Sequence, residues 1–263
     1  MPVTIETVTA TRYLTPLREG GSLPAIVEAD DGGLYVMKFV GSGHGPKALI
    51  AELVAGEIGR AMGLRVPELV FIELDPALGP SEPDAEIRDL LKASVGLNLG
   101  LRYLPNAFTF NPLLKPPPDG GLASAIVWFD AYVTNVDRTP RNVNMLIWQE
   151  ELWLIDHGSA LYFHYNWNGY MERSQTPFWR IKDHTLLPFA GDLDGADTAL
   201  RARLTPEVIQ HTVGLIPDGW LDGEPGFADQ TEHRQAYAAY LLSRLEASHL
   251  FVEEAKHART QSL

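Results

Sequence analysis

One continuous stretch, residues 122–158, constrains the fold of this chain more than any other part of the sequence. It predicts four parts in order: a buried helix, a polar loop, a two-stranded hairpin and an Asp-x-Gly tripeptide. These parts are Leu122–Val133, Thr134–Asn142, the strands Asn144–Trp148 and Leu152–Ile155 around Gln149-Glu150-Glu151, and Asp156-His157-Gly158. The apolar run is too long for an ordinary strand, which favours the helix.

This order of parts is typical of a kinase catalytic centre. There an Asp in the loop orients the substrate hydroxyl, and an Asn five residues later binds a metal ion. An Asp after the hairpin binds the metal ions that bridge the ATP phosphates, because Mg²⁺ prefers hard oxygen ligands. Asp137, Asn142 and Asp156 stand at these positions. We therefore predict Asp137 and Asn142 as catalytic residues, and Asn142 and Asp156 as magnesium ligands.

Composition excludes several other classes of function. The chain has 34 acidic and 21 basic residues, a formal net charge of −13, so we expect no nucleic-acid or anionic-membrane partner. It has no cysteine, which excludes disulfides, thiolate zinc sites and cysteine nucleophiles. No apolar run reaches the roughly 18 residues of a membrane span, and Met1-Pro2-Val3-Thr4 does not open a signal peptide. We expect a cytoplasmic protein without membrane insertion.

The first part of the chain is rich in predicted strands. They are Val3–Val8, Leu23–Ala29, Leu34–Val40 and Leu64–Leu74. The turn sequence Asp30-Asp31-Gly32-Gly33 joins the second and third of these into a hairpin. A helix is predicted over Pro46–Met62, since Pro46 suits a first turn and Gly63 a C-terminal stop.

Lys38 lies on the apolar face of its predicted strand, together with Val36 and Val40. A buried lysine needs an anionic partner, because an unpaired buried charge is costly. In kinases a strand lysine reaches the ATP phosphates and pairs with a glutamate on the next helix. We predict Lys38 and Glu52 in these roles, with Glu57 as the alternative partner. A solvent-exposed strand lysine is the other interpretation.

Two glycine-rich stretches compete for the phosphates. Gly20, Gly21 and Ser22 precede the hairpin, where a kinase glycine-rich loop stands, and we favour this stretch. The segment Gly41–Gly45 precedes a helix N-terminus, which also favours anions. Neither is a Walker A loop, because the chain has no Gly-Lys-Ser/Thr sequence.

The sequence predicts mainly helices in the remainder of the chain. Asp84–Lys92 predicts a short helix, and Val95–Tyr103 a strand or connector where the link between two lobes is expected. Further helices are predicted over Thr205–Val213 and Thr231–Arg259. We therefore expect an α+β, two-lobed protein-kinase-like fold, with a strand-rich N-lobe over residues 1–100 and a mainly helical C-lobe over residues 101–263.

Four segments together resemble the HipA-like kinases, which are relatives of the bacterial HipA toxin kinase and, more distantly, of the phosphoinositide kinases. They are V-M-K-F, G-P-K-A-L-I-A-E-L, N-V-D-R-T-P-R-N-V-N-M-L and L-W-L-I-D-H-G, and the similarity extends over about residues 15–250. The resemblance implies an ATP- and Mg²⁺-dependent kinase acting on a hydroxyl, with a protein Ser or Thr as the expected acceptor. It implies Asp137 as catalytic residue, Asn142 and Asp156 as metal ligands, and Lys38 as the phosphate-binding lysine.

The sequence departs from the family pattern in two ways. Its third motif is Asp-His-Gly rather than Asp-Phe-Gly, and the chain is shorter than the HipA toxin. We expect it to lack the extra N-terminal module of that toxin, and we therefore expect neither toxin activity nor antitoxin pairing. Two alternatives stay open: a nucleotide-binding pseudokinase or scaffold, and a metal-dependent phosphoesterase that uses Asp137, Asp156 and His157. We expect His157 to be a structural hydrogen-bonding residue.

Overall fold

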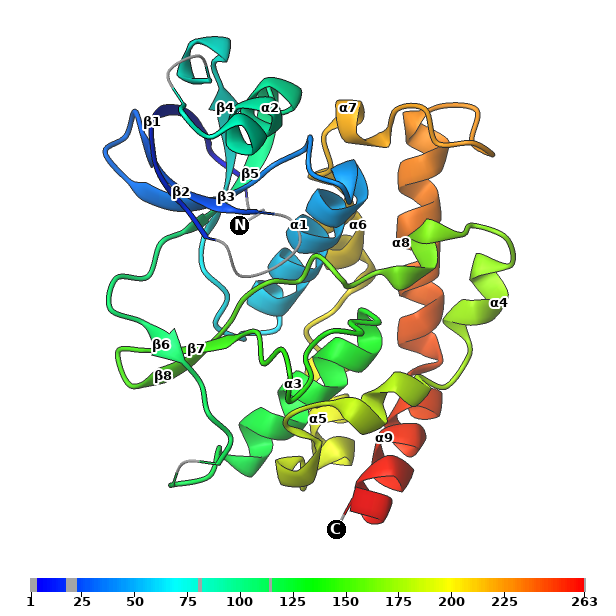
Figure 1. Cartoon of the computed structure of the whole chain (residues 1–263). Coiled ribbons are helices and arrows are strands. Elements are labelled where there is room, and N and C mark those ends of the chain that lie inside the picture. The colour runs from blue at the N-terminus through cyan, green and yellow to red at the C-terminus, as the bar shows by residue number, and fades with distance from the viewer. Residues whose placement is uncertain (1–3, 18–22, 80–81, 114, 263) are drawn as a thin grey trace.

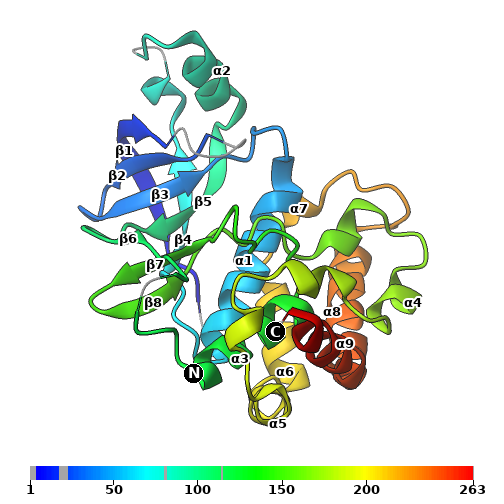
Figure 2. The same ribbon diagram turned by 60° about the horizontal axis from the view of Figure 1, so that its bottom comes forward.

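The computed structural model describes residues 4–17, 23–79, 82–113 and 115–262. Gly20, Gly21 and Ser22 lie outside the described residues, so their predicted role in phosphate binding stays a prediction. The described chain forms a strand-rich lobe and a mainly helical lobe (Figures 1 and 2). The strands are β1 (Thr7–Pro16), β2 (Ala25–Ala29), β3 (Leu34–Lys38), β4 (Leu69–Leu74), β5 (Gly96–Arg102), β6 (Phe108–Thr109), β7 (Met145–Trp148) and β8 (Glu151–Leu154).

The chain also contains α-helices and short 3-10 helices. The α-helices are α1 (Gly45–Ala61), α2 (Ala85–Ala93), α3 (Gly120–Tyr132), α4 (Tyr170–Ser174), α5 (Leu193–Arg201), α6 (Pro206–Gly214), α7 (Asp218–Leu221), α8 (Gln230–Glu246) and α9 (Ser248–Ser262). Short 3-10 helices are η1 (Pro76–Leu78), η2 (Tyr162–Tyr165), η3 (Trp179–Asp183) and η4 (Leu187–Phe189).

The first lobe is a closed barrel with strand order β1-β2-β3-β5-β4. Its neighbouring strands are antiparallel, except that β1 and β4 pair in parallel. The predicted β2–β3 hairpin is confirmed, and the side chain of Asp31 closes its turn by accepting from the Gly33 N–H at 2.8 Å and from the Tyr35 hydroxyl at 2.7 Å. Alternate side chains of β1, β2, β3 and β4 form one hydrophobic cluster of the barrel, as period-two sequences require, whereas β5 is buried at four consecutive residues, Asn98 to Leu101.

Two predicted strands begin later than expected. The sequence predicts a strand over Val3–Val8, whereas β1 begins at Thr7. Residues Thr7–Thr9 of β1 pair with β4, and the later part of β1 pairs with β2. The strand predicted from Leu64 begins at Leu69. Pro67 precedes it, and proline cannot donate a backbone hydrogen bond to a ladder.

Helix α1 joins the two lobes. Pro46 lies in its first turn, and Gly63, with a φ of +85°, takes the left-handed conformation that ends it, as the sequence predicts. Eleven consecutive residues of the helix are buried, from Leu49 to Gly59. It packs against strands β4 and β5 on the barrel and against α6 and α7, and its side chains belong to the large core that α3 also enters.

Strand β5 is a central barrel strand that pairs with both β3 and β4. It continues to Arg102, so we propose that the division between lobes lies after this residue rather than after residue 100. The chain then forms the small sheet β6-β7-β8 (Figure 1).

The β7–β8 hairpin has a tighter turn than the sequence suggests. Trp148 pairs with Glu151, so only Gln149 and Glu150 form the turn, and both have positive φ angles of 51° and 65°. Two consecutive residues of positive φ are typical of the turn that matches the twist of hairpin strands. Glu151 is therefore part of β8, while Ile155, predicted as strand, lies beyond it.

The second lobe is built around α3, α5, α6, α8 and α9 (Figure 2). The single helix predicted over Thr231–Arg259 is two helices, because α8 ends at Glu246 and α9 begins at Ser248. The apolar periodicity continues through the break, which conceals it in the sequence: Tyr240 precedes the break and Phe251 follows it, and both are buried. Among the described residues, no helix is long and apolar enough to cross a membrane; the cytoplasmic location stays a prediction.

We predict that Leu53→Ala destabilises the protein by about 2–5 kcal/mol. Leu53 is fully buried in α1, where a cavity would weaken the packing of both lobes on this helix. The measurement is chemical denaturation of both proteins. Arg201→Ala, which removes an exposed side chain of α5, is the control and should stay within about 0.5 kcal/mol of wild type.

Candidate active site

Lys38 connects the two lobes through two ion pairs. Its ammonium group forms an ion pair with Glu52 of α1 and lies 2.6 Å from Oδ1 of Asp156, which follows the hairpin. Glu52 is fully buried and the side chain of Lys38 is 12% exposed, whereas the side chain of Asp156 is 50% exposed. The predicted alternative partner, Glu57, instead pairs with Arg60 at 3.2 Å. The structure thus places the predicted lysine, glutamate and aspartate together.

The electrostatics keep both partners of this pair ionised. Burial disfavours the charge of Lys38, but the carboxylates of Glu52 and Asp156 outweigh that effect and raise its pKa. Burial likewise opposes ionisation of Glu52, yet the Lys38 ammonium and the bonds from His157 lower its pKa to about 2. The buried carboxylate is therefore an anion at neutral pH.

His157 occupies the middle position of the Asp-His-Gly motif and is fully buried. Its backbone N–H donates to Oε2 of Glu52 at 2.8 Å, and its Nδ1 lies 3.3 Å from Oε1 of the same carboxylate. The ring packs edge-on against Phe129 of α3, with 5.7 Å between centroids. The structure confirms that His157 is a structural hydrogen-bonding residue, since its backbone and its ring both contact the buried carboxylate of Glu52.

The polar loop places Asp137 beside Asn142. Oδ2 of Asp137 accepts from the Asn142 amide at 2.7 Å and lies 3.5 Å from the amide nitrogen of Asn144. The Asp137 N–H donates to Oδ1 of Asn135 at 3.1 Å. Burial raises the pKa of Asp137, and the charge of Asp156 raises it further, against the hydrogen bond from Asn142.

The open end of the hairpin determines where these groups lie. Asn144 and Asp156 both have left-handed backbone conformations, with φ angles of 49° and 56°. The carbonyl oxygen of Asn144 accepts from the Ile155 N–H at 3.1 Å and also from the guanidinium of Arg138. One backbone hydrogen bond therefore holds the end of the polar loop against the residue before Asp156.

A buried ionic network that the sequence analysis did not identify supports the loop. Asp130 of α3 accepts from Nε of Arg138 at 2.6 Å, from the Asn135 amide at 2.8 Å and from Nε2 of His184 at 2.8 Å. The Leu186 N–H donates to Nδ1 of His184, so the proton of this imidazole is on Nε2. Burial opposes ionisation of Asp130, but Arg138 and His184 lower its pKa. A lone carboxylate within the apolar run of α3 was the available signal.

A family model described as HipA-like kinase matches residues 11–253 of the chain. The chain belongs to the HipA-like kinase family. It is a phosphotransferase with a protein-kinase-like fold, as the motifs predicted. No curated protein matches it in sequence.

Solved structures are similar to this HipA-like kinase in fold. The Helicobacter pylori proinflammatory kinase CtkA matches with a TM-score of 0.57 and 13% identity, over 99% of each chain. A Golgi casein kinase with Mn and ADP bound matches with a TM-score of 0.49 and 12% identity, over 98% of this chain and 75% of that chain.

Gly41, in the second glycine-rich stretch of the kinase, has a packing role, whereas Gly43 and Gly45 have open space around them. The Gly41 N–H donates to Oγ of Ser94 at 3.1 Å, and a Cβ on Gly41 would lie 2.7 Å from the backbone of Ala93. A side chain at this position would therefore clash with the end of α2. This close approach explains Gly41 without phosphate contact, while the preferred stretch lies outside the described residues.

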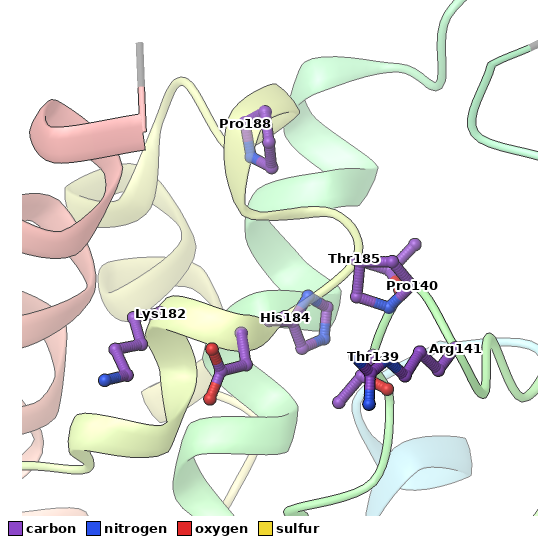
Figure 3. Close-up of a pocket in the computed structure, with 8 residues that line it drawn as sticks. Thr139, Pro140, Arg141, Lys182, His184, Thr185 and Pro188 are labelled. Atoms are coloured by element: carbon purple, nitrogen blue, oxygen red, sulfur yellow. The ribbon is translucent and has the colours of Figure 1, made fainter.

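A cavity of about 590 Å³ lies beside the catalytic loop (Figure 3). Thr139, Pro140 and Arg141 of the loop line one part of it, and the segment 182–188 lines the rest. His184 belongs to this lining and also binds Asp130. The buried network is therefore continuous with the wall of the cavity. Among the described residues, no group of three His, Cys, Asp or Glu side chains is placed to hold a metal ion.

We predict that Asp130→Ala destabilises the kinase by about 3–5 kcal/mol, because it leaves the guanidinium of Arg138 buried without its counter-ion. The measurement is the free energy of unfolding in urea. Asp194→Ala is the control, since its side chain is 72% exposed and pairs with Lys256 at the surface. An effect below about 1 kcal/mol at Asp130 would contradict a supporting role for this network.

The lowered pKa of Glu52 predicts an acid-dependent loss of stability. A carboxyl whose pKa falls on folding stabilises the protein above its unfolded value, about 4.3, and this contribution disappears as pH falls toward the folded value of about 2. Glu52→Gln should therefore be less stable than wild type at pH 7, and the difference should shrink between pH 5 and pH 2. Thermal unfolding across this range measures it; a constant difference would refute the assignment.

Proposed function

We propose that this kinase transfers the γ-phosphate of ATP, with Mg²⁺, to the hydroxyl of a protein serine or threonine. One observation supports the proposal most strongly. Lys38 lies between a buried glutamate and a half-exposed aspartate, and Asn144 connects the Asp137–Asn142 pair to the residue before Asp156 through its side chain and its carbonyl oxygen. A lysine–glutamate pair and metal-binding carboxylates must both be in place for kinase activity.

The available donor atoms fit magnesium. Asn142 is exposed, and its amide nitrogen is used by Asp137, which leaves its oxygen for a cation. Asp156 is half-exposed and has a second carboxylate oxygen beyond the one that contacts Lys38. Mg²⁺ is commonly held by one or two protein oxygens together with phosphate oxygens and waters. When bound here, it would neutralise developing charge on the phosphate oxygens.

We assign the remaining roles in phosphate transfer to residues of the chain. Asp137 would orient the acceptor hydroxyl and accept its proton as the hydroxyl oxygen bonds to the γ-phosphorus and the bond to the ADP oxygen breaks. Asn142 and Asn135 would hold Asp137 in place through the hydrogen bonds described above. Lys38 would position the phosphates, and Glu52 would position Lys38. Gly20, Gly21 and Ser22 are proposed to cover the phosphates.

We predict that Asp137→Asn lowers phosphate transfer by about 10²–10⁴-fold, because the amide cannot accept the proton. The measurement is transfer of radiolabelled phosphate from ATP to the kinase itself and to a mixed protein acceptor. Asp218→Asn, at a 78% exposed surface position, is the control and should retain wild-type transfer. Wild-type activity in Asp137→Asn would disprove this role.

We predict that Glu52→Gln raises the KM for ATP and lowers kcat, since Lys38 would lose the neighbour that holds it. The measurement is steady-state ATP consumption with added Mg²⁺, and chelation of the metal by EDTA should abolish it. Thermal shift with ATP gives the second measurement. Binding of ATP by wild type without any consumption would favour the pseudokinase instead.

A further inference from the structure

A groove of about 580 Å³ opens beside the catalytic loop, separate from the ion pairs of Lys38. Thr134 and Val136 line it, so the groove lies against the loop segment that immediately precedes Asp137, the residue proposed to receive the acceptor hydroxyl. Its other walls come from the segment after Asp-His-Gly and from residues 173–180, with Tyr240 and Arg244 of α8. It is therefore placed where a second substrate would approach the site.

Exposed aromatic side chains gather at this groove. Tyr162, Tyr165 and Trp179 line it and are 59%, 44% and 55% exposed. Large rings left this accessible in one place are typical of an interaction surface, because burying them on a partner is favourable. Phe163 has a different role in the same wall, since it is buried and stacks on Tyr240 with 3.5 Å between centroids.

The charge of the groove is opposite to that of the whole chain. Its lining includes Arg173, Arg180 and Arg244 and no acidic residue, although the chain has a net charge of −13. Arg244 is buried and donates to four backbone carbonyls of the second lobe. It therefore supports the wall of the groove.

Arg173 and Arg180 are held by groups without negative charge. The guanidinium of Arg173 donates to the carbonyl oxygens of Phe163 and Asn166, and its Nε is buried without a hydrogen-bond partner among the described residues. Arg180 is exposed and lies over the ring of Trp179, 4.4 Å from its centroid. Both guanidinium groups are thus positioned with their charges unopposed by a lining carboxylate.

We propose that this groove binds the acceptor polypeptide and selects an acidic side chain together with an aromatic or aliphatic one. The acidic side chain lies at Arg180 and Arg173, and the apolar one packs on Tyr162, Tyr165 and Trp179. This inference rests on the proposed function, because it assumes that the acceptor hydroxyl lies at Asp137. The cavity of Figure 3 fits this role less well, since its lining includes the carboxylate of Asp183 beside Arg141 and Lys182, and no Phe, Tyr or Trp ring.

The test uses the full chain with radiolabelled ATP, Mg²⁺ and a degenerate peptide library that has a central serine or threonine. We expect wild type to prefer acidic and apolar residues near the acceptor. Arg180→Glu should lower the preference for acidic over basic residues by at least about fivefold, because like charges oppose binding. Trp179→Ala should lower the preference for apolar residues. Arg201→Glu, the same charge change on α5, should keep the wild-type preferences.

A ratio between peptides is independent of the overall rate, so a partly damaged variant still gives an answer. Wild type without acidic or apolar preference would overturn the inference while leaving the kinase proposal intact. Unchanged selectivity in Arg180→Glu would also overturn it. Transfer to no library peptide would overturn it as well, and absence of ATP consumption in the same assay would identify failure of the proposed function itself.

Discussion

The buried carboxylate of Glu52 is the constraint on which the site depends. A charge in a protein interior is stable only when it is paired and hydrogen-bonded, so Glu52 requires the Lys38 ammonium on one side and the His157 N–H on the other. Those partners come from β3 of the barrel and from the segment after β8. One anion therefore brings together a helix, a barrel strand and the end of the hairpin.

A second buried anion does the same for the catalytic loop. Asp130 fixes Arg138, Asn135 and His184, and Arg138 in turn binds the carbonyl of Asn144. Asn135 also accepts a hydrogen bond from the Asp137 N–H. The backbone position of Asp137 therefore depends on Asn135, which Asp130 holds in place. The two anions hold different parts of the site, since Glu52 orders the segment that carries Asp156 and Asp130 orders the loop that carries Asp137.

Much of the candidate site could be predicted, because several of its residues lie close together in the sequence. The step from Asp137 to Asn142 and the short hairpin before Asp156 contain enough information, because a hairpin has few possible geometries. The Lys38–Glu52 pair was predicted because Lys38 lies on an apolar strand face and needs an anionic partner, and the kinase pattern places that partner on the next helix. The lone carboxylate of Asp130 in an apolar run signalled a buried partner, but its contact with His184 could not be derived, because His184 is 54 residues away and no periodic pattern connects them. The break between α8 and α9 was hidden because packing, rather than composition, determines it.

Asp156 illustrates how function and stability conflict within one residue. Its left-handed backbone costs an ordinary side chain about 1 kcal/mol or more, and glycine would relieve that cost. Glycine would also remove the carboxylate, and aspartate is among the few residues that tolerate this conformation while offering oxygen ligands. Glycine would also remove the ion pair with Lys38 and, under the function proposed above, a ligand of the magnesium ion.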